Sequence, residues 1–130
     1  MKKLAEVVRQ QVGLHLTHRQ IHALTVYERE LLDWNTRFNL TAIRDVEEIR
    51  TKHFLDSFTC LLAMRETPCD KVIDIGTGAG FPGLAVKIAM PAIRLTLVGS
   101  VSKKADFCRH MVQQLGLEQV EVIQDRAEAL

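Results

Sequence analysis

The sequence predicts an α/β fold in which helices come first and a parallel sheet follows. Up to about residue 66 the apolar residues recur at helical spacing, whereas from residue 71 onward short β-branched runs alternate with helical stretches. The order strand, helix, strand, helix, strand is typical of parallel βαβ units with right-handed crossovers. We therefore divide the chain into an N-terminal helical extension, residues 1–66, and a partial α/β domain, residues 67–130, that holds the first three strands of its sheet.

Composition excludes several classes of protein. Of the 130 residues, 47% are apolar and 25% are charged, which is ordinary for a globular domain. The net charge of +1 means that any affinity for nucleic acid has to come from a local patch. The N-terminus is too polar for a signal peptide and the apolar runs are far shorter than the ~18 residues of a membrane span, so we expect no membrane partner. Three cysteines without a C-x-x-C favour neither disulfides nor zinc, and they suit a reducing cytoplasm.

Three helices are predicted in the first segment. The first has apolar residues at helical spacing and ends at Gly13, a common helix C-cap residue. The second begins at a capping box, Thr17 to Gln20, and ends near Trp34, which we expect to be a core anchor. The segment "DVEE" at 45–48 repeats the capping signature. It predicts a third helix whose inner side carries Ile49, Phe54, Phe58, Leu61 and Leu62.

No metal site is expected in this segment. His18 and His22 form H-x-x-x-H, but no carboxylate or cysteine completes a ligand set at plausible spacing. An exposed helix face is the preferred interpretation.

The second segment should contain three strands and two helices, in the order "KVIDI" (71–75), "LAVKIAM" (84–90), "IRLTLV" (93–98), "SKKADFCRHMVQQLG" (102–116) and "VEVI" (120–123). Ser100 or Ser102 is the expected N-cap of the second helix, and Gly116 lies just past its end. A doubly wound sheet usually grows from its first strand in both directions, yet only one side is supplied here. We therefore expect the strand at 72–75 to be an exposed edge, and the chain to be a fragment or a truncated product.

The stretch "DIGTGAGFPG", Asp74 to Gly83, holds four glycines and one proline. A glycine loop that leaves a strand and opens a helix brings backbone N–H groups close to a ligand, and the helix N-terminus favours a carboxylate or phosphate there. Asp74 would either order the amides of the loop or meet an ammonium group, because an acid at a strand end needs such partners. Residues 78–83 also satisfy G-x-G-x-x-G, the dinucleotide fingerprint, so a nucleotide- or NAD-binding domain is the alternative.

The pattern Asp-x-Gly-x-Gly-x-Gly resembles the first motif of S-adenosylmethionine-dependent methyltransferases of the Rossmann-like class I fold. With Pro82-Gly83 after the third glycine, the stretch is similar to that of the RsmG (GidB) family, which methylates N7 of a guanine in 16S ribosomal RNA. Four further segments resemble that family in kind and order: "LLDWNTRFNLTAIRD" (31–45), "KHFLDS" (52–57), "SKKADF" (102–107) and "DRAEAL" (125–130). The resemblance covers essentially the whole chain.

The resemblance implies S-adenosyl-L-methionine as cofactor and 16S rRNA in the small ribosomal subunit as substrate, for a cytoplasmic protein that is a monomer when complete. Carried over by motif, Gly76, Gly78 and Phe81 would contact the methionine part of the cofactor, and Ala127 and Glu128 its adenine end. A core position under the loop is the alternative role for Phe81.

Gly99 stands where the family usually has an acid that binds the ribose hydroxyls, so its side chain cannot make those bonds. A non-catalytic RNA- or partner-binding remnant is therefore a second alternative function. The family's arginine that contacts cofactor or substrate would lie beyond Leu130, and we assign no catalytic residue.

Candidate RNA contacts lie in or beside the resembling helical segment: Arg37, Asn39, Arg44 and His53. A solvated basic face is the alternative interpretation of this segment. Lys103 and Lys104 stand in the first turn of a predicted helix, where positive charge opposes the helix dipole. Their position indicates either an anionic partner or two solvated lysines.

Overall fold

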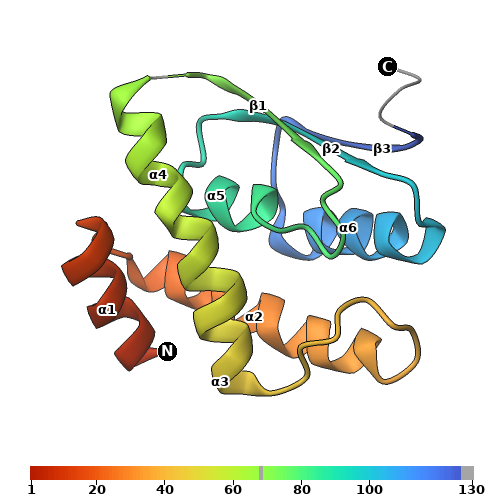
Figure 1. Cartoon of the computed structure of the whole chain (residues 1–130), viewed down its shortest axis with the longest axis horizontal. Helices are drawn as coiled ribbons and strands as arrows, with labels where there is room; N and C mark the ends of the chain where they lie inside the picture. Colours follow the sequence, from red (N-terminus) through yellow and green to blue (C-terminus); the bar gives the residue numbers. More distant parts are fainter. Residues whose placement is uncertain (68, 127–130) are drawn as a thin grey trace.

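The structure, a computed structural model, describes residues 1–67 and 69–126. It confirms an α/β fold in which N-terminal helices precede a parallel three-stranded sheet (Figure 1). The elements in chain order are α1 (Lys2–Val12), α2 (His18–Asn35), α3 (Val46–Glu48), the π-helical segment η1 (Ile49–Leu55), α4 (Asp56–Glu66), β1 (Lys71–Ile75), α5 (Gly83–Ala89), β2 (Arg94–Gly99), α6 (Ser102–Leu115) and β3 (Val120–Gln124).

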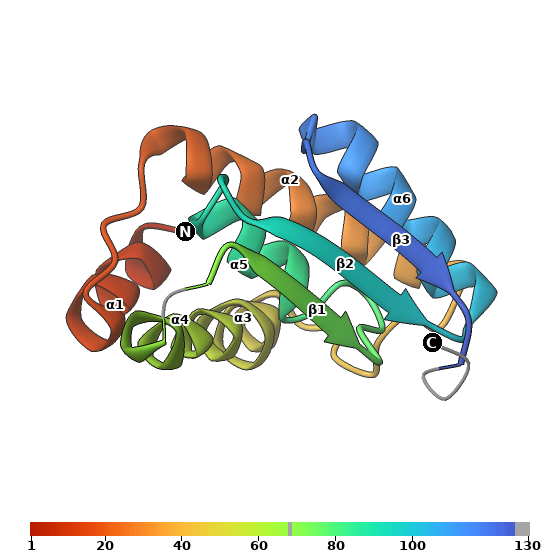
Figure 2. The same cartoon turned by 90° about the horizontal axis from the view of Figure 1, so that it is seen from above.

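The sheet is covered on one face. Its strand order is β1-β2-β3, and Ile75 lies opposite Val98 in the parallel register. Because both crossovers step in the same direction, right-handed connections place α5 and α6 on the same face. Helix α2 contacts both of them, so it forms a further layer beneath (Figures 1 and 2). This stacking brings α2 close to the loop that leaves β1, where Tyr27 contacts Ala79 and Phe81.

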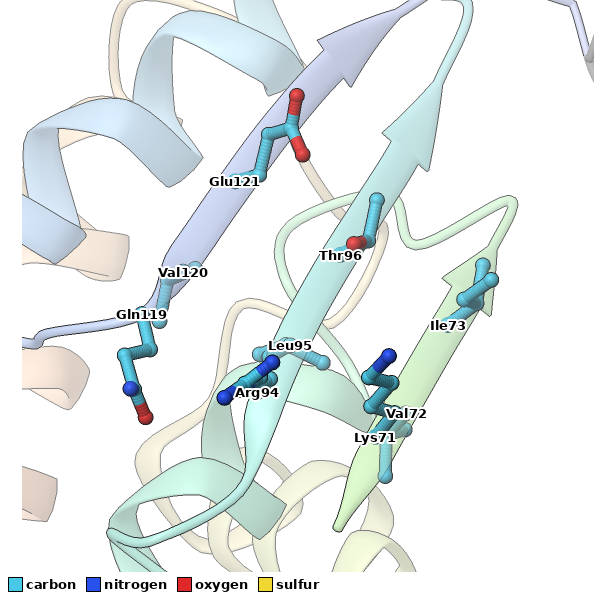
Figure 3. A pocket seen from close by; sticks show the side chains of 9 residues that line it. All are labelled: Lys71, Val72, Ile73, Arg94, Leu95, Thr96, Gln119, Val120 and Glu121. Atoms are coloured by element: carbon cyan, nitrogen blue, oxygen red, sulfur yellow. The ribbon is translucent and has the colours of Figure 1, made fainter.

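The opposite face of the sheet is bare in the described part of the chain. Ile73 and Ile75 of β1 are 65% and 59% exposed, and a shallow groove crosses all three strands past Thr96 and Glu121 (Figure 3). Among the described strands β1 pairs with β2 alone, so the predicted exposed edge is confirmed.

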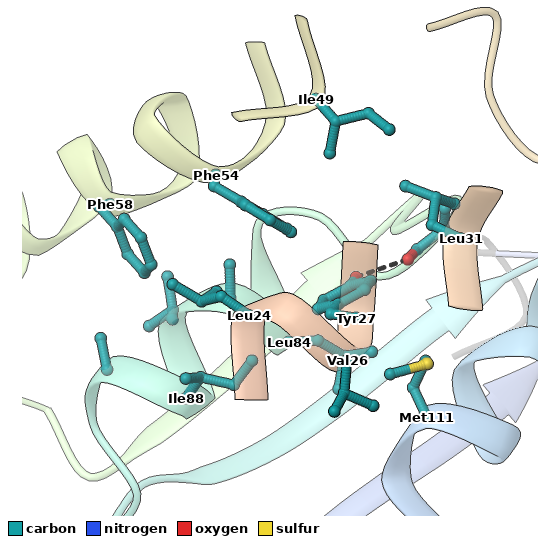
Figure 4. Close-up of a cluster of buried hydrophobic side chains, with 14 of the residues drawn as sticks. Leu24, Val26, Tyr27, Leu31, Ile49, Phe54, Phe58, Leu84, Ile88 and Met111 are labelled. Atoms are coloured by element: carbon teal, nitrogen blue, oxygen red, sulfur yellow. Dashed lines mark hydrogen bonds between the residues drawn. The ribbon is translucent and has the colours of Figure 1, made fainter. Parts of the chain in front are cut away.

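One continuous hydrophobic cluster joins the two segments of the chain. Tyr27 of α2 and Phe54 of η1 are fully buried together with Leu84 of α5 and Met111 of α6 (Figure 4). The helical extension is thus held to the α/β part by shared core packing. The division at residue 66 stays a prediction.

The predicted helix ends in the first segment are confirmed. Gly13 follows α1 with φ +74°, a left-handed conformation that glycine adopts readily. At the start of α2, the Gln20 N–H donates to Thr17 Oγ1 at 3.1 Å and the Thr17 N–H donates to Gln20 Oε1 at 2.8 Å. Both bonds of the capping box are therefore present.

The third helix differs from the prediction in its middle. Asp45 caps its start, but Ile49–Leu55 is π-helical and the stretch becomes α-helical again at Asp56. The two buried residues of η1, Ile49 and Phe54, are five positions apart, and the wider turn of a π-helix keeps them on one side. The inner side then continues through Phe58 and Leu61, while Leu62 is 43% exposed, so its predicted inward position was wrong.

Helix α6 begins at Ser102, as its predicted range has it, but its N-cap differs from the prediction. Val101 occupies the N-cap without a side-chain hydrogen bond, and Ser102 is the first helical residue, so neither predicted serine caps the helix. Gly116 ends it with φ +61°, as predicted.

Two kinds of feature are missing from the described ranges, residues 1–67 and 69–126. None of the helices there combines the length and apolarity that a membrane crossing requires. In the same ranges no three histidine, cysteine, aspartate or glutamate residues come together as metal ligands would.

Candidate functional site

The glycine loop runs from the end of β1 to the start of α5 and is anchored at both ends. The N–H groups of Gly76 and Thr77 both donate to the Val98 carbonyl oxygen, at 2.8 and 3.2 Å. Further along, the Gly80 N–H donates to the Thr77 carbonyl oxygen at 3.1 Å. Gly76, Gly78 and Gly80 have φ angles of +74°, +59° and +97°. Residues with a Cβ adopt such values only at a cost, which explains the glycines of the motif.

Asp74, at the end of β1, holds the loop in place through two hydrogen bonds. Its Oδ2 accepts hydrogen bonds from the Thr77 hydroxyl at 2.7 Å and from the Gly83 N–H at 2.9 Å. Burial raises the pKa of Asp74 above its usual value, and these two hydrogen bonds oppose that rise. Of the two predicted roles, the ordering of loop amides is confirmed.

The bond to Gly83 also occupies the start of the helix. The first N–H of α5 donates to the chain's own carboxylate and is therefore not available to an outside anion. A Cβ on Gly83 would lie 2.5 Å from Leu97 Cδ2 and 2.8 Å from Asp74 Oδ2, so only glycine fits between these two side chains.

Three polar groups of the loop and of the strand end before it have no partner among the described residues. Within the described part of the chain, the Gly78 and Ala79 N–H groups donate to no acceptor, and no donor pairs with Asp74 Oδ1. A Cβ built on Gly76 or Gly78 would meet nothing within 4 Å, so another molecule can approach the backbone there. Two free amide donors and one free carboxylate oxygen in one motif match in kind the carboxylate and ammonium groups of an amino acid.

Phe81 is sandwiched between two rings. Its ring is stacked on Tyr27 at 4.9 Å and on His53 at 4.2 Å between centroids, with interplanar angles of 7° and 4°. The Tyr27 hydroxyl also donates to the Ala79 carbonyl oxygen at 2.6 Å. The N-terminal helices therefore hold the loop in place, and only the edge of the Phe81 ring is left for a ligand.

His53 is the end ring of this stack and is half-buried against Phe81. Its Nε2 lies 3.0 Å from Thr41 Oγ1, and burial lowers the pKa of His53 below its usual value although Asp56 opposes the shift. The pKa of His53 in the unfolded chain is about 6.5, which is higher than its pKa in the folded chain. As pH falls through about 6.5, the unfolded chain binds a proton first, and the free energy of unfolding decreases.

We expect His53→Gln, which does not titrate, to lessen this acid sensitivity. The free energy of unfolding measured by urea denaturation should fall less steeply for the variant than for the wild type between about pH 7.5 and 5.5. Parallel pH profiles for the two proteins would contradict the assignment.

Gly99 lies at the end of β2, next to the loop. A Cβ here would meet only Thr77 Cγ2, at an ordinary 3.8 Å, so the space for a larger side chain is present. Its carbonyl oxygen accepts from the Asp125 N–H at 3.0 Å. Ala127 and Glu128, the predicted adenine contacts, lie outside the described residues.

Three of the four predicted RNA contacts gather in the loop after α2. Arg44 donates to the Asn35 carbonyl oxygen at 3.0 Å and to Asn39 Oδ1 at 2.7 Å. Arg37 lies 3.4 Å from Asp33 and its side chain is 55% exposed. His53 is separate from this group, in the ring stack.

Two residues that shape the site were missed by the sequence analysis. Thr77 stands inside the glycine motif three positions after Asp74, and that spacing was the signal available for the hydroxyl-to-carboxylate bond. Tyr27 carried no such signal, because its partner Ala79 is 52 positions away.

Comparison with known proteins identifies the family of this chain. Residues 20–130 match the family model GidB, rRNA small subunit methyltransferase G. Relatives named ribosomal RNA small subunit methyltransferase G occur in Roseiflexus sp. (strain RS-1), 52% identical over 91% of this chain and 50% of the relative, and in Alkaliphilus metalliredigens (strain QYMF), 43% identical over 92% and 50%. Another, from Pelotomaculum thermopropionicum (strain DSM 13744 / JCM 10971 / SI), is 42% identical over 98% of this chain and 55% of the relative. The chain spans about half the length of the curated relatives it matches.

Proposed function

The chain belongs to the GidB family, rRNA small subunit methyltransferase G, and from this we propose that it carries the cofactor loop of a methyltransferase acting on 16S rRNA. The reaction is the transfer of a methyl group from S-adenosyl-L-methionine to N7 of a guanine. One observation carries the proposal: within the described part of the chain, three polar groups of the same glycine motif, the Gly78 and Ala79 N–H groups and the Asp74 Oδ1, have no hydrogen-bond partner.

In this proposal the loop binds the amino-acid end of S-adenosylmethionine. The Gly78 and Ala79 N–H groups donate to its carboxylate, and Asp74 Oδ1 accepts from its ammonium group. Gly76 leaves the space for this approach, and the Phe81 edge borders it. Gly99 faces the ribose, and Ala127 and Glu128 the adenine end.

Bound S-adenosylmethionine supplies an activated methyl group on a sulfonium. Guanine N7 carries a lone pair of its own, so its attack needs little help from a base, and in-line positioning supplies much of the rate. The target guanine has to be presented unstacked, since a stacked base is hard to reach. The residues of this chain contribute binding and orientation, and we assign none of them a proton transfer.

Titration calorimetry with S-adenosylhomocysteine and with NAD tests the proposal. We expect this chain to bind S-adenosylhomocysteine and not NAD. Gly78→Ala should weaken that binding by about tenfold or more, because a methyl group would stand where the ligand approaches the loop backbone.

Gly116→Ala is the matched control. Gly116 has φ +61° against +59° for Gly78, and a Cβ at either position meets nothing within 4 Å, so the two variants carry the same backbone cost. Equal affinities of the two variants for S-adenosylhomocysteine, or binding of NAD in its place, would overturn the proposal.

The proposal also includes the setting of the reaction. We place it in the cytoplasm, on the small ribosomal subunit, with the complete protein acting as a monomer. Arg37, Asn39, Arg44 and His53 remain candidate RNA contacts.

A further inference from the structure

An aromatic and cationic surface lies where α2 ends and α6 begins. The part-exposed ring of Phe38 has Lys103 Nζ at 5.0 Å and Arg37 Cζ at 6.0 Å from its centroid. Trp34 lies beside it, with ring centroids 5.8 Å apart, and the Arg37 guanidinium is 5.9 Å from the Trp34 ring. We call these four residues, Trp34, Arg37, Phe38 and Lys103, the Phe38 platform.

The positive charge of the platform is little compensated. In residues 1–67 and 69–126 no carboxylate lies within 4.0 Å of Lys103, and Arg37 pairs only with Asp33, at 3.4 Å. Both side chains of that pair are more than half exposed, so the ion pair contributes little. Arg44, in the same loop, donates to a carbonyl and an amide oxygen, and neither of these acceptors carries a charge. The surface therefore attracts an anion while presenting a ring.

The Lys103 ammonium covers the Phe38 ring only through a weak cation–π contact. A cation over an exposed aromatic ring contributes less to stability than a nucleobase stacked on an aromatic side chain contributes to binding. A base therefore replaces Lys103 over Phe38 at a net gain, and the displaced ammonium becomes available to a phosphate. This combination favours an unpaired nucleotide over a simple anion, which gains nothing from the ring.

The platform lies at the same edge of the sheet as the glycine loop. Helix α6 starts directly after β2, and the loop starts directly after β1, whose last residue Ile75 is opposite Val98. Figure 2 shows the first turn of α6 beside the arrowhead of β2, next to the arrowhead of β1. The platform and the glycine loop therefore lie at the same end of the strands.

We propose that Phe38 stacks an unpaired base of the RNA strand, with Arg37 and Lys103 binding its phosphates. The inference rests on the proposed function, since it concerns the RNA substrate of the same site, and it assigns a base-binding position near, but outside, the cofactor loop. It also gives a role to the lysine that stands unfavourably in the first turn of α6.

Trp34, the single tryptophan of the chain, serves as a reporter because it contacts the Phe38 ring. The chain is titrated with a single-stranded oligoribonucleotide of about eight nucleotides and with an abasic strand of the same length. We expect the strand with bases to quench Trp34 fluorescence and to bind about tenfold more tightly than the abasic strand.

Variants of the platform separate its two contributions. Phe38→Leu should lower affinity for the oligoribonucleotide about tenfold and abolish the preference over the abasic strand, while Phe38→Tyr, which keeps a ring, should retain both. Lys103→Gln should reduce the salt dependence of binding by about 0.7 in the log–log slope yet keep the preference for bases. Thermal unfolding checks that each variant is folded. If Phe38→Leu does not fold, the abasic comparison on the wild type decides.

Equal binding of the two strands by the wild type, or an unchanged preference in a folded Phe38→Leu, would overturn the platform and leave a plain cationic surface. Calorimetry with S-adenosylhomocysteine keeps the two proposals apart. Base-dependent RNA binding without S-adenosylhomocysteine binding would contradict the proposed function but not the role of the Phe38 platform. Binding of S-adenosylhomocysteine without base-dependent RNA binding would contradict only the role of the platform.

Discussion

Gly80→Ala is expected to lower the free energy of unfolding by about 4 kcal/mol. Gly80 has φ +97°, and forcing a residue with a Cβ to a positive φ costs ~1–2 kcal/mol. The added Cβ would also lie 2.5 Å from both Tyr27 Oη and Leu84 Cδ1, and overpacking of this kind costs ~1–3 kcal/mol. Tyr27 cannot move aside without losing its 2.6 Å hydrogen bond to Ala79. Urea denaturation followed by far-UV circular dichroism measures the loss.

Gly116→Ala again supplies the control. It shares the positive φ, at +61°, but has nothing within 4 Å of an added Cβ, so it should cost only about 1 kcal/mol. Most of the difference between the two variants then reports the clash with Tyr27 and Leu84, and the rest reports the larger φ of Gly80, +97° against +61°. Equal losses would show that the loop is not packed against α2 as described.

Asp74→Ala is expected to cost about 3 kcal/mol of stability. The substitution leaves the Thr77 hydroxyl and the Gly83 N–H without their shared acceptor in a buried place, and each unsatisfied group costs ~1–3 kcal/mol. Asp45→Ala is a useful control, because Asp45 accepts a single bond, from the Glu48 N–H at 3.2 Å, at an exposed helix start. It should cost about 1 kcal/mol.

Asp74→Asn separates the two roles given to this carboxylate. An amide oxygen still accepts from Thr77 and Gly83, so most of the stability should be kept. The amide N–H₂ then stands in place of Oδ1 and repels an ammonium group, so the affinity for S-adenosylhomocysteine should fall at least about tenfold. A variant that keeps full affinity would remove Asp74 from the proposed cofactor contacts while leaving its structural role intact.

The elements that the sequence predicted well are those whose determinants are local. The capping box at Thr17 and Gln20 and the glycines at 13 and 116 fix helix ends through bonds within a few residues of the chain. The strand "KVIDI" was predicted with its observed bounds, and the other two strands to within about a residue. The glycine motif likewise predicted a loop between strand and helix, because its positive φ angles belong to the glycines themselves.

The errors arose where packing overrides local preference. The spacing of five between Ile49 and Phe54 fits a π turn, yet only the core beneath η1 makes that turn worth its poorer hydrogen-bond geometry. Leu62 is 43% exposed, although its apolar side chain suits the inner side equally well. At α6 two nearby serines offered a cap, and the structure uses neither.

The sequence alone determined the order of elements, the parallel sheet, the glycine loop and the family, because each depends on spacing between residues close in the chain. Tertiary structure alone decided what the loop rests on and what faces outward. Tyr27 and His53 come from distant helices to enclose Phe81, and Lys103 of α6 meets Phe38 after α2. No local pattern specifies such pairs, since contacts between residues far apart in the chain depend on how the helices pack on the sheet and on one another.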